Sequence, residues 1–174
     1  MKILVVVDMQ NDFISGALGS PAAQSIVEPV AKRVSEFSGR VIFTRDTHTD
    51  EYMQTQEGRK LPVSHCIKGT LGWQIAEEIK IPENSVIFDK ITFGSEELAS
   101  YLKELDKKEQ ISEIELCGLC TDICVISNAF LIKAAIPECE ITVNAALCAG
   151  VSDASHKNAL NAMRACQINV INEA

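Results

Sequence analysis

Residues 114–135 read IELCGLCTDICVISNAFLIKAA, and the rest of the chain is organised around them. The apolar segment Ile114–Cys117 predicts a strand, which turns directly into a helix with Thr121 as N-cap and Cys124 in the first turn. The positive end of a helix dipole lowers a thiol pKa, so this placement favours a nucleophilic thiolate. Free cysteine is also among the most buried residue types. Position alone therefore leaves a purely structural role for Cys124 open.

The composition indicates a globular protein that can form a core without disulfide bonds or other cross-links. The chain has 174 residues, of which 47% are hydrophobic and 23% charged, and this predicts one domain over residues 1–174. A formal net charge of −8 argues against a nucleic acid or an anionic membrane as partner. No uncharged apolar run approaches the ~20 residues that span a bilayer. The N-terminal MKILVVVDMQ is expected to form a strand, not an export signal, and seven cysteines then favour reduced thiols in the cytoplasm.

Strands and helices are predicted to alternate along the whole chain. The expected strands are residues 2–7, 40–44, 85–88, 114–117, 140–144 and 169–171. Helices are expected at residues 30–37, 73–78, 94–107 and 154–166 and after the 114–117 strand. This alternation predicts an α/β fold, a three-layer α/β/α Rossmann-like domain with a mainly parallel sheet of about six strands.

Three of these strands end in residues that suit catalysis. Asp8 follows the first strand, Lys90 the third and Cys124 the fourth. The carboxyl ends of neighbouring parallel strands share one edge, so the three side chains can converge there. A carboxylate can take the proton of a thiol, a lysine stabilises both anions, and backbone N–H groups of the turn before Cys124 can bind an oxyanion. Taken alone, Asp8 is equally compatible with a loop or capping role.

Residues 45–72 form a long polar connection, which in a compact domain usually indicates a functional loop. Asp46 and His48 form a D-x-H pair, and on an extended segment both side chains point to the same face. A third ligand from the far end of the loop would complete a divalent metal site of mixed nitrogen and oxygen type. Simple solvation of these loop residues is the alternative.

Several motifs occur together in a fixed order along the chain. They are LVVVDMQNDF at 4–13 followed by Gly16 and Leu18, D-x-H at 46–48, HC-x-x-GT-x-G at 65–72, the strand ending in Lys90, G-x-x-TDICV at 118–125 and AxxAGVSD at 146–153. With these motifs the chain resembles the isochorismatase-like cysteine hydrolases over nearly its whole length, and most of all their nicotinamidase branch.

This resemblance implies a cysteine amidohydrolase that converts a small carboxamide, with nicotinamide as the leading substrate, to the acid and ammonia through a thioester. The implied catalytic residues are Asp8, Lys90 and Cys124, with the backbone amides of Cys120 and Cys124 as oxyanion hole and a cis peptide at Leu119-Cys120. The implied metal ligands are Asp46, His48 and His65 with Glu57 as a possible fourth, for Zn, Fe or Mn. The implied substrate pocket contains Phe13, Leu18 and the residue at position 61, Leu61.

One motif departs from the family pattern. In the nicotinamidase pattern, the second metal histidine lies in a W-P-x-H-C motif, whereas residues 61–66 of this chain read LPVSHC. Leu61 thus replaces a tryptophan, and one additional residue precedes His65. Aromatic stacking helps to hold a pyridine ring, and Leu61 cannot supply it. The sequence therefore predicts a small amide as substrate more firmly than it predicts nicotinamide in particular. The additional residue leaves open whether His65 reaches the metal site.

Two other classes of function stay open. The first is a different hydrolysis on the same fold, of an N-carbamoyl or ureido amide or of an isochorismate-type vinyl ether; the vinyl ether is disfavoured because that reaction does not depend on the cysteine. The second is a non-catalytic metal- or redox-binding protein that uses Cys117, Cys120 and Cys124. The expected partners are a small amide substrate and further copies of the chain in a homo-oligomer of open size, with neither nucleic acid nor membrane.

Overall fold

The computed structural model describes residues 1–173. Six strands form one sheet: β1 (Lys2–Val7), β2 (Arg40–Asp46), β3 (Val86–Lys90), β4 (Glu113–Leu119), β5 (Glu140–Ala149) and β6 (Asn169–Ile171). They lie in the order β3-β2-β1-β4-β5-β6, and every neighbouring pair is parallel. The predicted α/β fold with a mainly parallel sheet of about six strands is confirmed.

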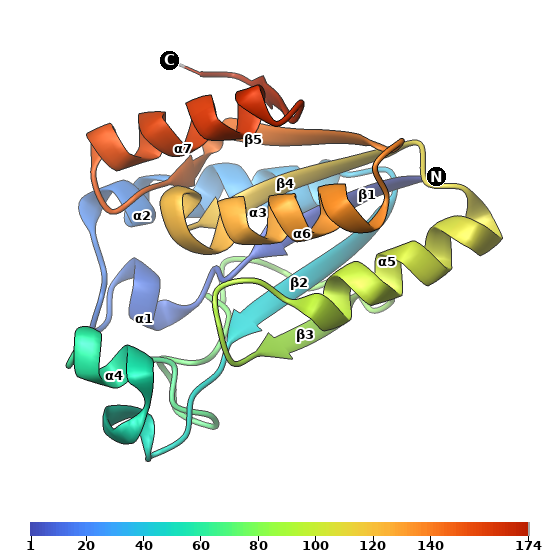
Figure 1. Cartoon of the computed structure of the whole chain (residues 1–174). Coiled ribbons are helices and arrows are strands. Elements are labelled where there is room, and N and C mark those ends of the chain that lie inside the picture. Colours follow the sequence, from blue (N-terminus) through green and yellow to red (C-terminus); the bar gives the residue numbers. More distant parts are fainter. Residues whose placement is uncertain (174) are drawn as a thin grey trace.

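Helices cover both faces of this sheet (Figure 1). They are α1 (Asn11–Ile14), α2 (Pro21–Ser25), α3 (Val27–Glu36), α4 (Gln56–Lys60), α5 (Glu96–Glu109), α6 (Ile126–Ala135) and α7 (Asp153–Ala165), with the 3-10 helix η1 (Tyr52–Gln54) and the π-helix η2 (Thr121–Val125). Helix α6 packs between α5 and α7 on one face, and α3 lies on the other. Within residues 1–173, no helix is both long and apolar enough to cross a membrane.

The sheet order places a crevice where ligands usually bind. From β1 the chain adds β2 and β3 on one side, then returns to add β4, β5 and β6 on the other. Connections therefore run over opposite faces on the two sides of the β1–β4 pair, and the carboxyl ends of these two strands lie at the topological switch point. Asp8 directly follows β1, and η2 follows β4 after one residue.

Strand β1 lies at the centre of the core. Residues Ile3–Val7 have no exposed surface, as expected for a strand that is covered on both faces. Its neighbour β4 approaches it closely at Gly118, whose φ is +116° and where an added Cβ would lie 2.0 Å from the carbonyl oxygen of Val7. Only glycine fits both this conformation and this gap. The tight β1–β4 contact fixes the two strand ends that lead to Asp8 and to Cys124.

Two sequence-based expectations about local structure were wrong. No helix forms at residues 73–78; this segment consists of turns and one bridge, Gln10↔Ile75. Its backbone pairs with the segment that follows β1 and not with itself: the N–H of Asn11 donates to the carbonyl of Gln74, and the N–H of Ala76 donates to the carbonyl of Met9. Strand β5 also continues to Ala149, five residues beyond the expected end, because Cys148 and Ala149 still pair with Gly118 and Leu119 of β4.

Candidate active site

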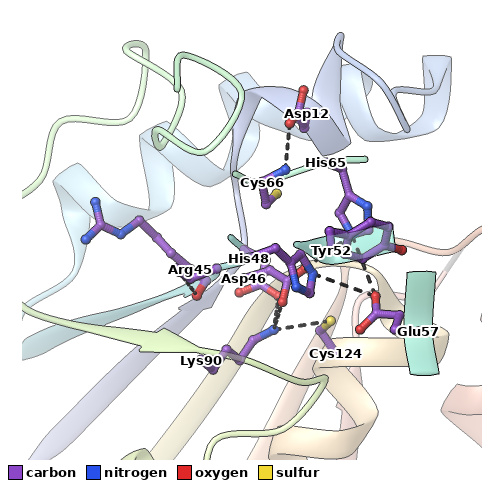
Figure 2. A network of polar contacts seen from close by, with 12 residues as sticks. Asp12, Arg45, Asp46, His48, Tyr52, Glu57, His65, Cys66, Lys90 and Cys124 are labelled. Carbon is purple, nitrogen blue, oxygen red and sulfur yellow. Dashed lines mark hydrogen bonds and ion pairs between the residues drawn. The ribbon is translucent and has the colours of Figure 1, made fainter. Parts of the chain in front are cut away.

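Three buried side chains meet at the carboxyl edge of the sheet. Asp8 follows β1 with a φ of +47°, Lys90 is the last residue of β3, and Cys124 lies in η2. The Nζ of Lys90 lies 2.6 Å from Oδ2 of Asp8 and 3.5 Å from Sγ of Cys124. Figure 2 shows the Lys90 amine pointing at the Cys124 thiol. The structure thus brings together the three strand-end residues that the sequence singled out.

A threonine that sequence analysis missed holds Asp8. The hydroxyl of Thr44 donates to Oδ1 of Asp8 at 2.6 Å, and the N–H of Asp8 donates to the carbonyl of Thr44 at 3.2 Å. Thr44 is fully buried near the end of β2. Side chains alternate along a strand, so Thr44 had to point to the same face as Asp46 two residues later. That alternation was the available signal.

The charges of the three groups depend on one another. Burial raises the pKa of Asp8, although the neighbouring Lys90 opposes this. Burial likewise raises the pKa of Cys124, again opposed by Lys90 and reinforced by Asp8 and Asp46. Burial alone would lower the pKa of Lys90, but the anionic groups around it raise the pKa above its ordinary value. Lys90 therefore stays a cation, and a proton can pass from Cys124 to Asp8 without changing the net charge of the three groups.

The turn before Cys124 differs in detail from the expected helix start. Residues Thr121–Val125 form a π-helix, and Cys120 occupies the N-cap position without a side-chain cap. The Thr121 hydroxyl instead lies 2.8 Å from Nδ1 of His156, because it is buried against α7 and does not face the end of the helix. The cis peptide that the resemblance implied at Leu119-Cys120 is present. Cys124 still stands at the amino end of a continuous helical run, because α6 follows η2 directly.

A second polar cluster, formed by Asp46, His48, Glu57 and His65, lies next to the first (Figure 2). Oδ2 of Asp46 lies 2.9 Å from Nε2 of His48 and 3.4 Å from Nε2 of His65. Oε1 of Glu57 lies 3.8 Å and 3.7 Å from the same two nitrogens. Four ligands at about 2.0–2.1 Å from a tetrahedral Zn²⁺ are roughly 3.3 Å apart. The spacing and the donor types therefore fit a transition metal.

The additional residue before His65 does not move this side chain out of reach. Nδ1 of His65 lies 2.8 Å from the carbonyl of Val63, so an Nδ1–H donating to that oxygen leaves the lone pair of Nε2 facing Asp46 and Glu57. Such an outer hydrogen bond is typical of metal-binding histidines. The ring of Tyr52 packs edge-on against His48 and His65, at centroid distances of 4.7 Å and 5.0 Å.

The electrostatics of this cluster favour a bound cation. Although burial opposes it, hydrogen bonds from His48 and His65 hold the pKa of Asp46 below its usual range. Burial and the charge of Asp46 raise the pKa of Glu57. Two carboxylates this close are favourable together only when positive charge lies between them. Among the described residues, the one group with metal-binding geometry contains no cysteine, which disfavours the cysteine-based binding protein.

Two further residues that the sequence analysis did not identify hydrogen-bond to the backbone at or next to two members of this cluster. Gln10 is fully buried; its Oε1 accepts the N–H of Asp46 at 2.7 Å, and its Nε2 donates to the carbonyls of Asp46 and Trp73, both at 2.8 Å. Oδ2 of Asp12 accepts the N–H of Cys66 at 2.7 Å, which fixes the backbone next to His65. Both residues belong to the MQNDF segment, whose polar side chains were the available signal.

A cavity of about 480 Å³ joins the two polar clusters. Asp46, Glu57 and His65 line one part of it, and Cys120 and Cys124 another. The expected pocket residues Phe13, Leu18 and Leu61 all lie on its wall, together with Leu119, Ile123, Phe93 and Val151, which the sequence did not indicate. Neither lysine nor arginine is among the residues that line it. The cavity therefore combines a buried thiol, a cluster of imidazole and carboxylate groups that could hold a metal ion, and apolar walls.

Residues 2–174 match the family model of the isochorismatase domain. The chain belongs to the isochorismatase family. Among curated proteins, the nicotinamidase of Saccharomyces cerevisiae is 27% identical over 74% of this chain and 80% of that protein. Among isochorismatase-like structures, the pyrazinamidase of Pyrococcus horikoshii in complex with zinc is 25% identical, with a TM-score of 0.83 over 99% of both chains. The N-carbamoylsarcosine amidase of Thermoplasma acidophilum is 28% identical, with a TM-score of 0.78 over 97% of this chain and 94% of that one.

Proposed function

We propose that this protein is a cysteine amidohydrolase that converts nicotinamide to nicotinate and ammonia. The observation that carries the proposal is the cavity whose wall contains both the thiol of Cys124, which is paired with Lys90, and three of the four candidate metal ligands, Asp46, Glu57 and His65. The nicotinamidase and pyrazinamidase among the relatives support the same reaction. A pyridine ring that carries a carboxamide offers one group to each of the two clusters.

In the first half of the reaction, the sulfur of Cys124 attacks the amide carbon. Asp8, held by Lys90 and Thr44, accepts the thiol proton, and the Lys90 ammonium stabilises the thiolate that forms. The backbone N–H groups of Cys120 and Cys124 are assigned to the developing oxyanion. Protonated Asp8 then gives its proton to the leaving nitrogen. The C–N bond breaks, ammonia leaves, and a thioester remains on Cys124.

In the second half, water hydrolyses the thioester. Asp8 is a carboxylate again and takes a proton from the attacking water, so the same residue acts as base twice. Collapse of the second tetrahedral intermediate breaks the C–S bond and releases the acid. The proton then returns from Asp8 to the Cys124 sulfur, and the charge state of the three residues is restored.

Asp46, His48, His65 and Glu57 are the residues that would hold a divalent transition metal. Two imidazoles and two carboxylates suit Zn²⁺, Fe²⁺ or Mn²⁺ better than Mg²⁺ or Ca²⁺. When bound, such a metal supplies an electron-pair acceptor for a ring nitrogen. The role of the four residues is therefore substrate binding and orientation, separate from the thiolate chemistry at Cys124.

The same geometry disfavours the alternative hydrolase substrates. An N-carbamoyl or ureido acid carries a carboxylate, and a buried carboxylate needs a cationic partner. Among the described residues, no lysine or arginine lines this cavity to pair with such a group. A neutral amide avoids this mismatch in charge.

Release of ammonia from nicotinamide, benzamide, N-carbamoylsarcosine and an aliphatic amide tests the function directly. We expect turnover with nicotinamide to exceed turnover with each of the others. Peptide mass spectrometry after an acid quench is expected to find the nicotinoyl group on Cys124. Preferential release from N-carbamoylsarcosine, or an acyl group on another cysteine, would contradict the proposal.

We further propose that the enzyme is a single domain that works in the cytoplasm as a homo-oligomer. All seven cysteines are free, which suits a reducing compartment. Large apolar side chains such as Leu71 and Ile91 are exposed and could be covered by another copy. Light scattering coupled to size-exclusion chromatography measures the oligomeric state, and an entirely monomeric species would contradict that part.

A further inference from the structure

The cavity has a polar inner end and an apolar mouth. Cys124 and His65 are buried, but Leu61, Phe93 and Val151 line the same cavity while being 38%, 43% and 69% exposed. These three apolar side chains come from three separate connections: after α4, between β3 and α5, and between β5 and α7. Convergence of exposed apolar side chains from separate loops is characteristic of a surface that binds an apolar group.

The cavity is also larger than a single ring requires. About 480 Å³ falls in the range of pockets that enclose drug-sized ligands. In a pyridine-3-carboxamide, the ring nitrogen and the carboxamide are assigned to the metal ligands and to Cys124. Ring carbon 5 is meta to both of these groups, so a substituent there points away from both clusters. The part of the cavity wall that belongs to neither cluster is mainly apolar and includes the three residues of the mouth.

We propose that the site accepts neutral pyridine-3-carboxamides that carry an apolar substituent on ring carbon 5, and that Leu61 determines this specificity. This inference rests on the proposed nicotinamide hydrolysis. Leu61 stands one helical turn after Glu57: its N–H donates to the Glu57 carbonyl at 2.8 Å, and its carbonyl accepts the Tyr52 hydroxyl at 2.8 Å. The backbone of Leu61 is thus fixed beside the metal ligands, while its half-exposed side chain sets the width of the mouth. A larger side chain here would occupy the space of the substituent.

Charge selects against other substituents at the same position. Asp46 and Glu57 are assigned to the metal, and among the described residues no lysine or arginine lines the cavity. An anionic substituent would therefore be desolvated without a partner. A 5-carboxylate is the matched compound that keeps the position and the planar shape but adds a negative charge.

The test compares kcat/KM for ammonia release from nicotinamide, 5-phenylnicotinamide and 5-carboxynicotinamide. The variants are Leu61→Trp, which fills the mouth, Leu61→Ala, which widens it, and the control Leu71→Trp, at an exposed leucine outside this cavity. In the wild type we expect kcat/KM for the phenyl compound to stay within about tenfold of nicotinamide and to exceed that of the carboxylate. Steric selection in an apolar pocket amounts to roughly 10- to 200-fold. Leu61→Trp is therefore expected to lower the phenyl-to-nicotinamide ratio at least about tenfold, and neither Leu61→Ala nor Leu71→Trp is expected to lower it.

The outcomes separate this inference from the function on which it depends. If nicotinamide is hydrolysed but the phenyl compound is more than about tenfold poorer, the inference is wrong and the proposed function stands. The same holds if Leu61→Trp lowers kcat/KM equally for both amides, or if the carboxylate is the better substrate. If no pyridine carboxamide releases ammonia, the proposed function fails and the inference fails with it.

Discussion

The two clusters of the site are built from different parts of the chain. Asp8, Lys90 and Cys124 each lie at or just after a strand end of one sheet, so strand register sets their separation. Glu57 and His65 belong to the long connection between β2 and β3, and their positions depend on side chains such as Asp12 that hold that connection. Asp46 joins the two regions: it is paired with Lys90 in the β2–β3 register, and its Oδ1 lies 3.6 Å from Nζ of Lys90. The reactive end of the site is thus fixed by the fold, and the binding end by loop contacts.

The largest effect is expected from removal of the thiol. Cys124→Ala should lower kcat by roughly 10³-fold or more, because the covalent route is lost. The unfolding midpoint should change little, since only one sulfur is removed. Cys166→Ala, at an exposed cysteine, is the matched control and should keep full activity. Turnover by Cys124→Ala near that of the control would contradict the assignment of Cys124 as the nucleophile.

Loss of the metal site should impair binding more than chemistry. His48→Ala, or treatment with a chelator, should raise KM for nicotinamide by at least about 10- to 100-fold, the range found when only a hydrogen-bond partner of a metal ligand is removed. Benzamide, which lacks a ring nitrogen, should be much less affected. Elemental analysis before and after chelation gives the metal content independently of activity. A fall in kcat for both amides with KM unchanged would show that the metal cluster contributes to the chemical step and not to substrate binding.

A smaller and more selective effect is expected at Thr44. Thr44→Val keeps the shape of the side chain but removes the hydrogen bond to Asp8, and it should lower kcat by about tenfold with KM nearly unchanged. Thr44→Ser keeps the hydroxyl and should recover most of kcat. A merely structural role would make serine, which leaves a cavity, as damaging as valine or more so. Steady-state kinetics and unfolding midpoints on both variants decide between the two.

The smallest effect on kcat is expected at the loop support. Asp12→Ala removes the acceptor for the Cys66 N–H and should weaken metal affinity by about tenfold while leaving kcat at saturating metal nearly unchanged. Asp12→Asn keeps an acceptor oxygen and should bind metal almost as the wild type does. Competition with a chromogenic chelator measures the affinity. A loss of kcat as large as that of Thr44→Val would mean that the loop also positions the reactive end.

The difference between the two regions also explains what the sequence could predict. Asp8, Lys90 and Cys124 were accessible because apolar runs locate strands, and strand ends locate the edge of the sheet. Asp46 and His48 followed from their spacing, whereas assigning Glu57 and His65 needed the resemblance to a family. Thr44 was missed because only its alternation with Asp46 along the strand pointed to it. Phe93 and Val151 were missed because apolar side chains carry no chemical signal until the backbone places them. The turns at residues 73–78 were mistaken for a helix because their hydrogen-bond partners lie near Met9 and Asn11, far away in the sequence.

The close contact at Gly118 limits how this protein can be re-engineered. A side chain of any size at this position would collide with the carbonyl oxygen of Val7. The collision would push β4 away from β1 and move Cys124 relative to Asp8. Directed evolution toward larger leaving groups therefore cannot widen the reactive end through the strands. Useful variation is confined to the loops around the cavity, which a saturation library can explore while the sheet is left as it is.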